Sequence, residues 1–147
     1  MDKIFGYDLI CYEDSIEFAM ELCQQPNEVK EEEEENIRQE LFENLKTMHS
    51  LKMVHRDIKE PNIGWSEEFG RWVFLDFGFS TMLRQSIGQK TYTKFIGTFK
   101  YTYDELQKLY YFERGDEVDF YYNDIYGLER SIKKIVQERV EKKEKEK

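Results

Sequence analysis

The stretch that decides the fold is HRDIKEPN at residues 55–62, with DFG further along at residues 76–78. Between them lie two short runs rich in β-forming residues, 63–65 and 72–75, separated by the polar turn 66–70. This pattern predicts a β-hairpin. The hairpin would bring Asp57, which precedes it, close to Asp76, which follows it.

Composition bounds the kind of protein that carries this stretch. With 147 residues, 39% hydrophobic and 16% aromatic, the chain is apolar enough for one domain with a buried core. The net charge of -9 argues against a nucleic-acid partner, because a phosphate backbone binds to basic surfaces. Part of this acidity is a run at residues 31–35, typical of a solvated segment.

Cysteine usage and hydropathy bear on location. Cys11 and Cys23 are the two cysteines, and no Cys/His spacing typical of a zinc site is present. We therefore expect both to be reduced and buried in an intracellular, cytoplasmic protein. No apolar run approaches the roughly 20 residues of a membrane span, and the first residues do not resemble a secretion signal. No membrane partner is expected.

The first third of the chain predicts one extended segment and two helices. Residues 4–12 are typical of an extended segment. Asp14, with Glu17 three residues later, predicts a helix that Pro26 would end. A stronger helix is predicted over roughly 33–50, where apolar residues recur at helical spacing. Its repeating positions are Ile37, Leu41, Leu45, Met48 and His49.

The last third predicts a loop and two more helices. Residues 80–100 carry four basic and no acidic side chains, and their Ser, Thr and Gly content predicts a loop. This basic segment is either simply solvated or a surface for acidic peptides. A short helix is predicted at 106–111, and an amphipathic one from about Asn123 or Asp124. The charged end from Glu141 is expected to fray.

Together these motifs resemble the C-terminal lobe of a eukaryotic-type protein kinase of the serine/threonine branch. In the family's order, the catalytic loop at 55–62 and DFG at 76–78 precede GTFKY at 97–101 and DIYG at 124–127. The resemblance implies an α+β fold, mainly α-helical, with a short β-hairpin at the catalytic loop. It implies a partial kinase domain over residues 1–136, running from the hinge to the final core helix, and a charged tail over 137–147.

The resemblance also implies a chemistry, the transfer of a phosphoryl group from ATP and Mg²⁺ to a hydroxyl of a protein substrate. Asp57 would accept or orient the hydroxyl proton, and Lys59 would neutralise the transferring phosphate. Asn62 and Asp76 would bind Mg²⁺, for which oxygen ligands are suited. Lysine at position 59 is typical of the serine/threonine branch.

Regulation is implied at the segment 80–100 by the same resemblance. Arg56 would receive a phosphate or carboxylate from this segment through charge-assisted hydrogen bonds. The regulatory candidates are Arg56, Thr91, Thr93 and Thr98. His55 is expected to be structural, and His49 a residue at a helix end without a chemical role.

Several features depart from the family pattern. The glycines contain no Gly-x-Gly-x-x-Gly phosphate loop, and no strand of the Val-Ala-Ile-Lys type occurs. By resemblance residues 4–13 are the hinge between lobes, so the N-terminal lobe is expected to be missing. Gly64 stands where the family has an apolar adenine floor. Glu105 would be a buried carboxylate whose usual arginine partner lies beyond the last helix, so the fold would be incomplete at both ends.

Two hypotheses therefore stay open. In the first, the chain is a serine/threonine kinase that is not autonomous and works with a complementary N-lobe or partner protein. In the second, it is a pseudokinase-like binding or scaffold module without catalysis. The missing nucleotide clamp favours the second hypothesis, and the intact catalytic loop favours the first.

Overall fold

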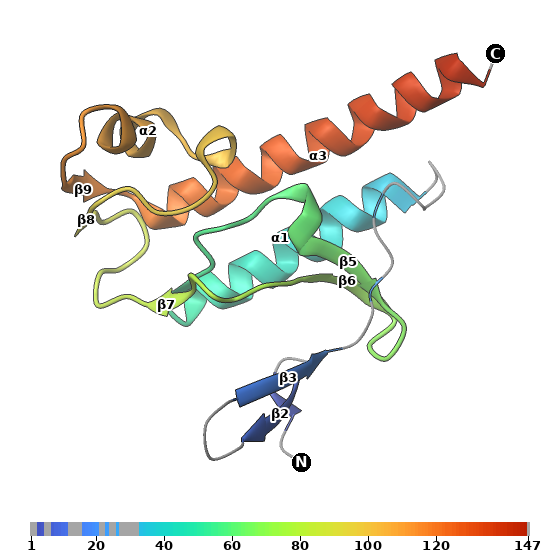
Figure 1. Ribbon diagram of the computed structural model, residues 1–147, viewed down its shortest axis with the longest axis horizontal. Coiled ribbons are helices and arrows are strands. Elements are labelled where there is room, and N and C mark those ends of the chain that lie inside the picture. Colours follow the sequence, from blue (N-terminus) through green and yellow to red (C-terminus); the bar gives the residue numbers. More distant parts are fainter. Residues whose placement is uncertain are drawn as a thin grey trace.

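The computed structural model describes residues 33–146, together with Cys23, Pro26 and the backbone of strand segments 3–4, 7–11 and 16–20. The described residues form three α-helices with small antiparallel sheets around them (Figure 1). The helices are α1 (Glu34–Ser50), α2 (Asp104–Tyr111) and α3 (Phe120–Lys145). The fold is thus mixed α/β, with the long helices α1 and α3 crossing its centre.

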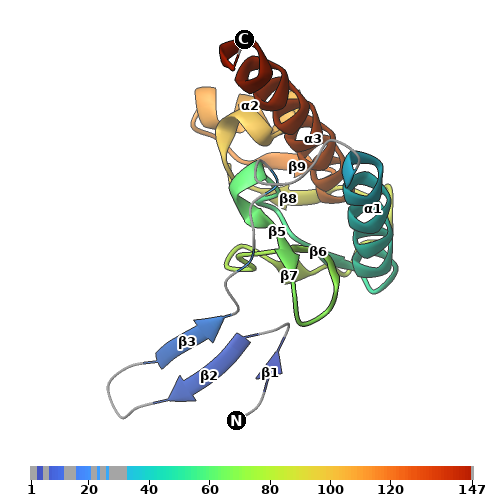
Figure 2. The same ribbon diagram turned by 90° about the vertical axis from the view of Figure 1, so that its right-hand side faces the viewer.

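The amino-terminal strands form an antiparallel sheet in the order β1 (Lys3–Ile4), β2 (Tyr7–Cys11), β3 (Ile16–Met20). Figure 2 shows this sheet projecting from the helical body. The helix predicted from Asp14 to Pro26 is therefore wrong, because β3 pairs with β2 along its whole length. The residues of β3 include apolar side chains at positions 16, 18 and 20, which is the period of two typical of a strand. Asp14 itself lies outside the described residues.

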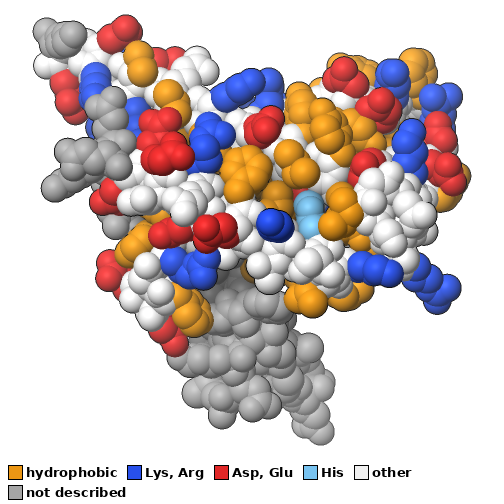
Figure 3. Space-filling model, turned by 180° about the vertical axis from the view of Figure 1, so that it is seen from behind, with side chains coloured by type: hydrophobic (Ala, Val, Ile, Leu, Met, Phe, Trp, Pro, Cys, Tyr) orange, Lys and Arg blue, Asp and Glu red, His pale blue; other side chains and the backbone are white. Residues whose placement is uncertain are grey.

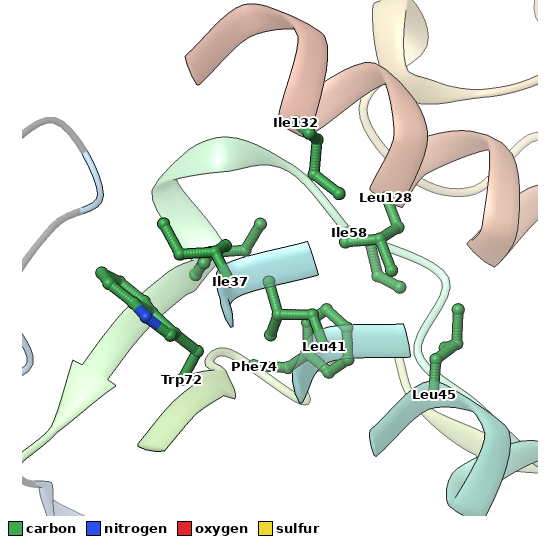
Figure 4. Packing of buried hydrophobic residues seen from close by; sticks show 9 residues of the cluster. Ile37, Leu41, Leu45, Ile58, Trp72, Phe74, Leu128 and Ile132 are labelled. Atoms are coloured by element: carbon green, nitrogen blue, oxygen red, sulfur yellow. The ribbon is translucent and has the colours of Figure 1, made fainter. Parts of the chain in front are cut away.

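Helix α1 confirms the prediction made for residues 33–50. Ile37, Leu41 and Leu45 follow one another at four-residue spacing and are buried on one face. This face packs against the hairpin and against α3, as Figure 4 shows. The resulting hydrophobic cluster is aliphatic at its centre and supports the catalytic loop through Ile58.

The predicted hairpin is confirmed as β5 (Ile63–Ser66) paired with β6 (Arg71–Phe74). Gly70 closes the turn at φ 61° and donates its N–H to the Ser66 carbonyl at 2.8 Å. Helix α1 fixes the outer strand, since Glu40 accepts the N–H of Trp72 at 2.7 Å. The hairpin is thus bonded to a helix rather than standing alone.

The segment 80–100, predicted to be a loop, contains three short elements. These are β7 (Thr81–Met82), β8 (Thr91–Thr93) and the 3₁₀ turn η4 (Phe99–Tyr101). Strand β7 pairs with β4 (Met53–Val54), and β8 pairs with β9 (Asp116–Val118). Helix α2 begins two residues before the predicted start and buries Leu106 and Leu109.

Helix α3 is longer than predicted at both ends. Asp119 caps it by accepting the N–H of Tyr122 at 3.0 Å, so the helix begins at Phe120. The fraying expected from Glu141 is wrong, because the helix continues to Lys145. Glu and Lys are strong helix formers, and Gln137 bonds to Glu141 one turn later at 3.2 Å. Among the described residues, no helix has the length and apolarity needed to cross a membrane.

Candidate active site

The catalytic loop runs from β4 into the 3₁₀ turn η3 (Glu60–Asn62) and then directly into β5. Asp57 and Asn62 are both buried along this path. The side-chain amide of Asn62 donates to the Asp57 carbonyl at 2.9 Å and lies 3.4 Å from its carboxylate. The amide nitrogen of Asn62 donates to Asp57, so the amide oxygen of Asn62 remains as the atom that can coordinate a cation.

Thr98 joins Asp57 to Lys59 from the other side. Its hydroxyl donates to Oδ1 of Asp57 at 2.7 Å and accepts from Nζ of Lys59 at 3.0 Å. The Lys59 ammonium also lies 3.7 Å from Oδ2 of Asp57. Sequence reasoning placed Thr98 among the regulatory candidates, whereas its hydroxyl lies inside this cluster of acid, lysine and threonine.

Asp76 is brought to the same place by the hairpin. The N–H of Leu75 donates to the Asn62 carbonyl at 2.8 Å, which extends the pairing of β5 with β6 up to Asp76. Asp76 has a positive φ of 52°, and its Oδ1 accepts the N–H of Gly78 at 3.1 Å. A non-glycine residue in this conformation is uncommon and occurs often at functional sites.

The ring of His55 connects the loop that contains Asp57 to the segment that leads into Asp76. Its Nδ1 accepts the N–H of Asp57 at 3.1 Å, and its Nε2 lies 2.8 Å from the Leu75 carbonyl. Because Nδ1 accepts a hydrogen bond, Nε2 is the nitrogen that donates to the Leu75 carbonyl. The fully buried ring thus has the structural role that the sequence predicted. It fixes Asp57 relative to the residue before Asp76.

Asp124 on α3 holds the catalytic loop from beneath. Its carboxylate accepts the N–H groups of His55 and Arg56, each at 2.9 Å. It also lies 3.0 Å from Nε2 of His49, in the last turn of α1. His49 lies in the last turn of α1, as predicted, and its ring is buried against this carboxylate. The local sequence pattern does not predict this pairing, because the two residues lie 75 positions apart in the chain.

Two glycines allow the close approach of segments at this point. A Cβ at Gly127 of α3 would lie 2.8 Å from the Ile58 carbonyl. A Cβ at Gly97 would lie 2.9 Å from the Arg56 carbonyl, and Gly97 has a φ of 116°. Both glycines therefore let the backbone of the catalytic loop lie directly against its neighbours.

The regulatory candidates are not all brought together. Arg56 donates to the Phe79 carbonyl and stacks over the ring of Phe120 at 5.2 Å. Burial lowers the pKa of its guanidinium, and the Asp124 carboxylate acts in the opposite direction. Thr91 and Thr93 lie in β8, opposite Val118 and Asp116 of β9. Among the described interactions, none joins Arg56 to either threonine.

The structure changes the interpretation of two expected departures from the family pattern, at Gly64 and at Glu105. A Cβ at Gly64 would lie only 2.5 Å from Cβ of Cys23, so a larger side chain at position 64 would collide with this residue. Cys23 is half-buried there rather than buried as predicted. Glu105 is exposed at the start of α2, so the predicted cost of an unpaired buried carboxylate does not arise.

The described side chains meet only part of the needs of a metal ion. Among the described residues, no group of three or more His, Cys, Asp or Glu side chains forms a self-sufficient metal site. The expected metal ligands Asn62 and Asp76 lie at adjacent ends of the hairpin strands, and their side-chain oxygens are of the type that Mg²⁺ prefers.

Comparison with known proteins agrees with this arrangement. A family model described as "Protein kinase domain" matches residues 7–146. The probable serine/threonine-protein kinase fnkB of Dictyostelium discoideum is 31% identical over 80 residues, covering 54% of this chain and 15% of that protein. The serine/threonine-protein kinase PKH3 of Eremothecium gossypii is 35% identical over 79 residues, covering 49% and 11%.

A third relative is the meiosis-specific serine/threonine-protein kinase mek1 of Schizosaccharomyces pombe, 32% identical over 73 residues. That match covers 48% of this chain and 16% of the relative. The chain belongs to the protein kinase family, since the family model covers nearly all of it. In each of these three relatives, the matched stretch is a small part of a much longer protein.

Proposed function

We propose that this chain provides the catalytic half of a serine/threonine protein kinase. The observation that carries this proposal is the cluster of Asp57, Lys59 and Thr98. Asn62 is bonded to this cluster, and Asp76 follows strand β6 two residues after its end. Mg-ATP would supply the phosphoryl group when bound, with Asn62 and Asp76 as protein ligands of the metal.

Asp57 is the proposed base because its carboxylate is buried and its position is set from three sides. Thr98 donates to one oxygen, and Asn62 and Lys59 lie near the other. Each carboxylate oxygen has two lone pairs, so a substrate hydroxyl can still donate a hydrogen bond to Asp57. Asp57 would then orient this hydroxyl and take up its proton.

Lys59 and His55 have different proposed roles. The Lys59 ammonium is a compact charge on a flexible stem, so it can turn from Thr98 toward a transferring phosphate. His55 does not touch a reacting atom and acts as a positioning residue, since its ring links Asp57 to Leu75. Arg56, Thr91 and Thr93 are kept as proposed regulatory residues, to be tested by phosphorylation.

The second candidate function is a binding or scaffold module without catalysis. It is favoured by one observation: these 147 residues contain no Gly-x-Gly-x-x-Gly loop to cover a nucleotide. Under our proposal, the part that covers the nucleotide would lie outside these 147 residues.

Thermal shift with Mg-ATP separates the two candidates. Binding to the folded state raises the melting temperature by an amount that grows with ligand concentration. We expect a shift at millimolar Mg-ATP that Asp76→Asn reduces and that EDTA removes. A shift unchanged in Asp76→Asn contradicts the metal assignment, and no shift, either alone or with an added N-lobe, favours the binding module over the kinase proposal.

Transfer of labelled phosphate to protein tests the catalytic assignment itself. We expect any transfer activity, alone or with an added N-lobe, to fall by about 10³-fold in Asp57→Asn. Glu60→Gln serves as the matched control. It makes the same change from a carboxylate to an amide in the same loop, at a residue with no proposed role in the reaction. Equal activity in Asp57→Asn and the wild type would remove Asp57 from the mechanism.

A further inference from the structure

Helix α3 has an accessible side opposite the side that packs into the core. Its buried positions include Asp124, Leu128, Ser131 and Ile135, which follow one another at spacings of three and four residues. On the other side lie six residues, here called the α3 stripe: Tyr122, Tyr126, Glu129, Lys133, Val136 and Val140. Tyr126 and Val136 are half-buried, and the other four are exposed. The helix therefore carries a second face that its own chain does not fully bury.

The α3 stripe has the spacing of a coiled-coil seam. Its members recur at alternating intervals of four and three residues, which is the period of 3.5 residues at which two helices contact along their length. Both ends of the stripe are apolar, with Tyr122 50% and Val140 51% exposed, and its centre is charged. An amphipathic helix of a monomer needs one apolar side, whereas α3 has apolar residues on two sides.

The α3 stripe lies where another helix can reach it. In Figure 1 α3 runs along the edge of the molecule, and its last turns extend beyond the other elements. In Figure 3, seen from behind, hydrophobic side chains stand among acidic and basic ones along the upper edge, where α3 runs. From Tyr122 to Val140 the helix makes about five turns over about 27 Å, so a second helix can contact the stripe along this length.

The order of its residues makes the α3 stripe complementary to itself. When two copies of α3 lie antiparallel about a twofold axis between Glu129 and Lys133, each residue faces the one at the same distance on the other side of the centre. Glu129 then meets Lys133 of the second copy, and the reciprocal pair forms by symmetry. The apolar pairs are Tyr122 with Val140 and Tyr126 with Val136.

The two charged residues also select the orientation. In a parallel pair Glu129 would face Glu129 and Lys133 would face Lys133, and like charges in contact are unfavourable. Among the described residues, neither of the two has an ion-pair partner in its own chain. Both are exposed, so both are available to a second copy.

We propose that two copies of this chain associate through the α3 stripe with their α3 helices antiparallel. The apolar residues at the ends would pack against each other, and two pairs of Glu129 with Lys133 would fix the register at the centre. This proposal concerns an interaction surface and does not depend on the proposed kinase function. Because each copy contributes four apolar side chains, association should be reversible and visible at micromolar concentrations.

Sedimentation equilibrium of the full chain, at concentrations between about 1 and 200 µM, tests the association. The mean mass should rise with concentration from 18.0 kDa toward twice that value. Glu129→Lys and Lys133→Glu should each raise the dissociation constant by about tenfold or more, since each change places like charges together twice in the dimer.

Combining the two charge reversals provides the rescue. The double variant restores opposite charges across the interface and should associate as the wild type does. An equimolar mixture of the two single variants should associate too, because each supplies the charge that the other lacks. A general loss of structure in either single variant would not be reversed in this way.

Lys142→Glu is the matched control for charge reversal. Lys142 lies nine residues after Lys133, or two and a half turns, so it projects from the opposite side of α3, where it is exposed. Its reversal should leave the dissociation constant unchanged. Val140→Ser, at an apolar end of the α3 stripe, should weaken association about tenfold. Melting curves show whether each variant is folded.

Disulfide formation between copies measures the orientation. In a background with Cys11→Ser and Cys23→Ser, a chain that carries both Tyr122→Cys and Val140→Cys should give cross-linked dimers on oxidation, because the two positions meet across the interface. Tyr122→Cys without the change at Val140 should not, since the two copies of position 122 lie at opposite ends of the interface, about 27 Å apart.

Three results would overturn the proposal. A mass of 18.0 kDa at every concentration would leave the α3 stripe to a different partner. Association that neither charge reversal weakens, or that Lys142→Glu weakens equally, would place the contact on another surface. Efficient cross-linking by Tyr122→Cys without the change at Val140 would show a parallel pair.

Discussion

Residues 55–78 and residues 80–95 follow each other in the chain but are held in opposite ways. In the first segment, His55, Asp57 and Asn62 are buried, and hydrogen bonds connect each of them to another part of the site. In the second, Met82, Ile87 and Tyr92 are 63%, 63% and 69% exposed. The first segment therefore holds a fixed geometry, whereas the second is accessible to other molecules.

The contacts of the second segment are also of a different kind. It is attached by two short antiparallel pairings, β4 with β7 and β8 with β9. In the second pairing, Thr93 lies opposite Asp116 and Tyr92 opposite Glu117 in the backbone register. A few edge pairings of this type open more easily than a buried network.

Limited proteolysis gives the largest expected contrast. Trypsin should cut after Arg84 or Lys90, both exposed, about a hundredfold faster than after Arg56 or Lys59 in the catalytic loop, because local opening suffices at the first pair. Mass spectrometry of early digestion products measures this ratio. Early cleavage after Arg56 would contradict the picture of a rigid catalytic loop.

Asp124→Asn tests the network beneath the catalytic loop. It replaces an acceptor of two backbone N–H groups by an amide that faces donors with an N–H₂ group. We expect a loss of roughly 2–4 kcal/mol in the free energy of unfolding, measured by urea titration. Asp119→Asn at the start of α3 is the control, since Asn caps helices as well as Asp does. Equal losses in both variants would refute the special role of Asp124.

Paired glycine variants compare the two regions directly. In Gly127→Ala the new Cβ meets the Ile58 carbonyl, which cannot move away. We expect a loss of about 1–2 kcal/mol after the better helix propensity of alanine is included. In Gly115→Ala the new Cβ meets the hydroxyl end of the exposed Tyr92 ring, which can rotate. Thermal melts should therefore show a much smaller loss for Gly115→Ala than for Gly127→Ala.

The smallest expected effect concerns the pH dependence of α3. Burial, and then the neighbouring carboxylate of Glu60, raises the pKa of Glu138 above 4.5. The folded state then binds this proton more tightly than the unfolded state, so the contribution of Glu138 is present below pH 4.5 and lost as pH rises through the raised pKa. Glu138→Gln should thus melt progressively higher relative to wild type as pH rises from 4 to 7. A constant difference would contradict the raised pKa.

Much of the fold could be predicted where the periodicity was long or the turn was distinct. Helix α1 has buried positions at 37, 41 and 45, and the hairpin has a polar turn with Gly70. The five residues of β3 were misread because a short apolar run fits either period. The end of α3 was misread because fraying was judged from the missing apolar face, although Glu and Lys favour helices without one.

The candidate site was predictable as a set of residue types but not as a network. The order of Asp57, Lys59, Asn62 and Asp76 carries the resemblance, and the hairpin prediction brings them together. The bond between His49 and Asp124 joins residues 75 positions apart, and local patterns contain no information about such a pair. The same holds for Cys23 beside Gly64, which only the folded chain reveals.

The carboxylate of Asp124 also sets the order in which the molecule can mature. Its three partners lie 68, 69 and 75 residues earlier, so they must wait until α3 has been synthesised and has docked. Closing such long loops is slow compared with forming a helix or a hairpin. A nascent chain would therefore carry α1 and the hairpin first, with a catalytic loop that acquires its final shape last. Whatever depends on the shape of residues 55–62 is therefore completed late in folding.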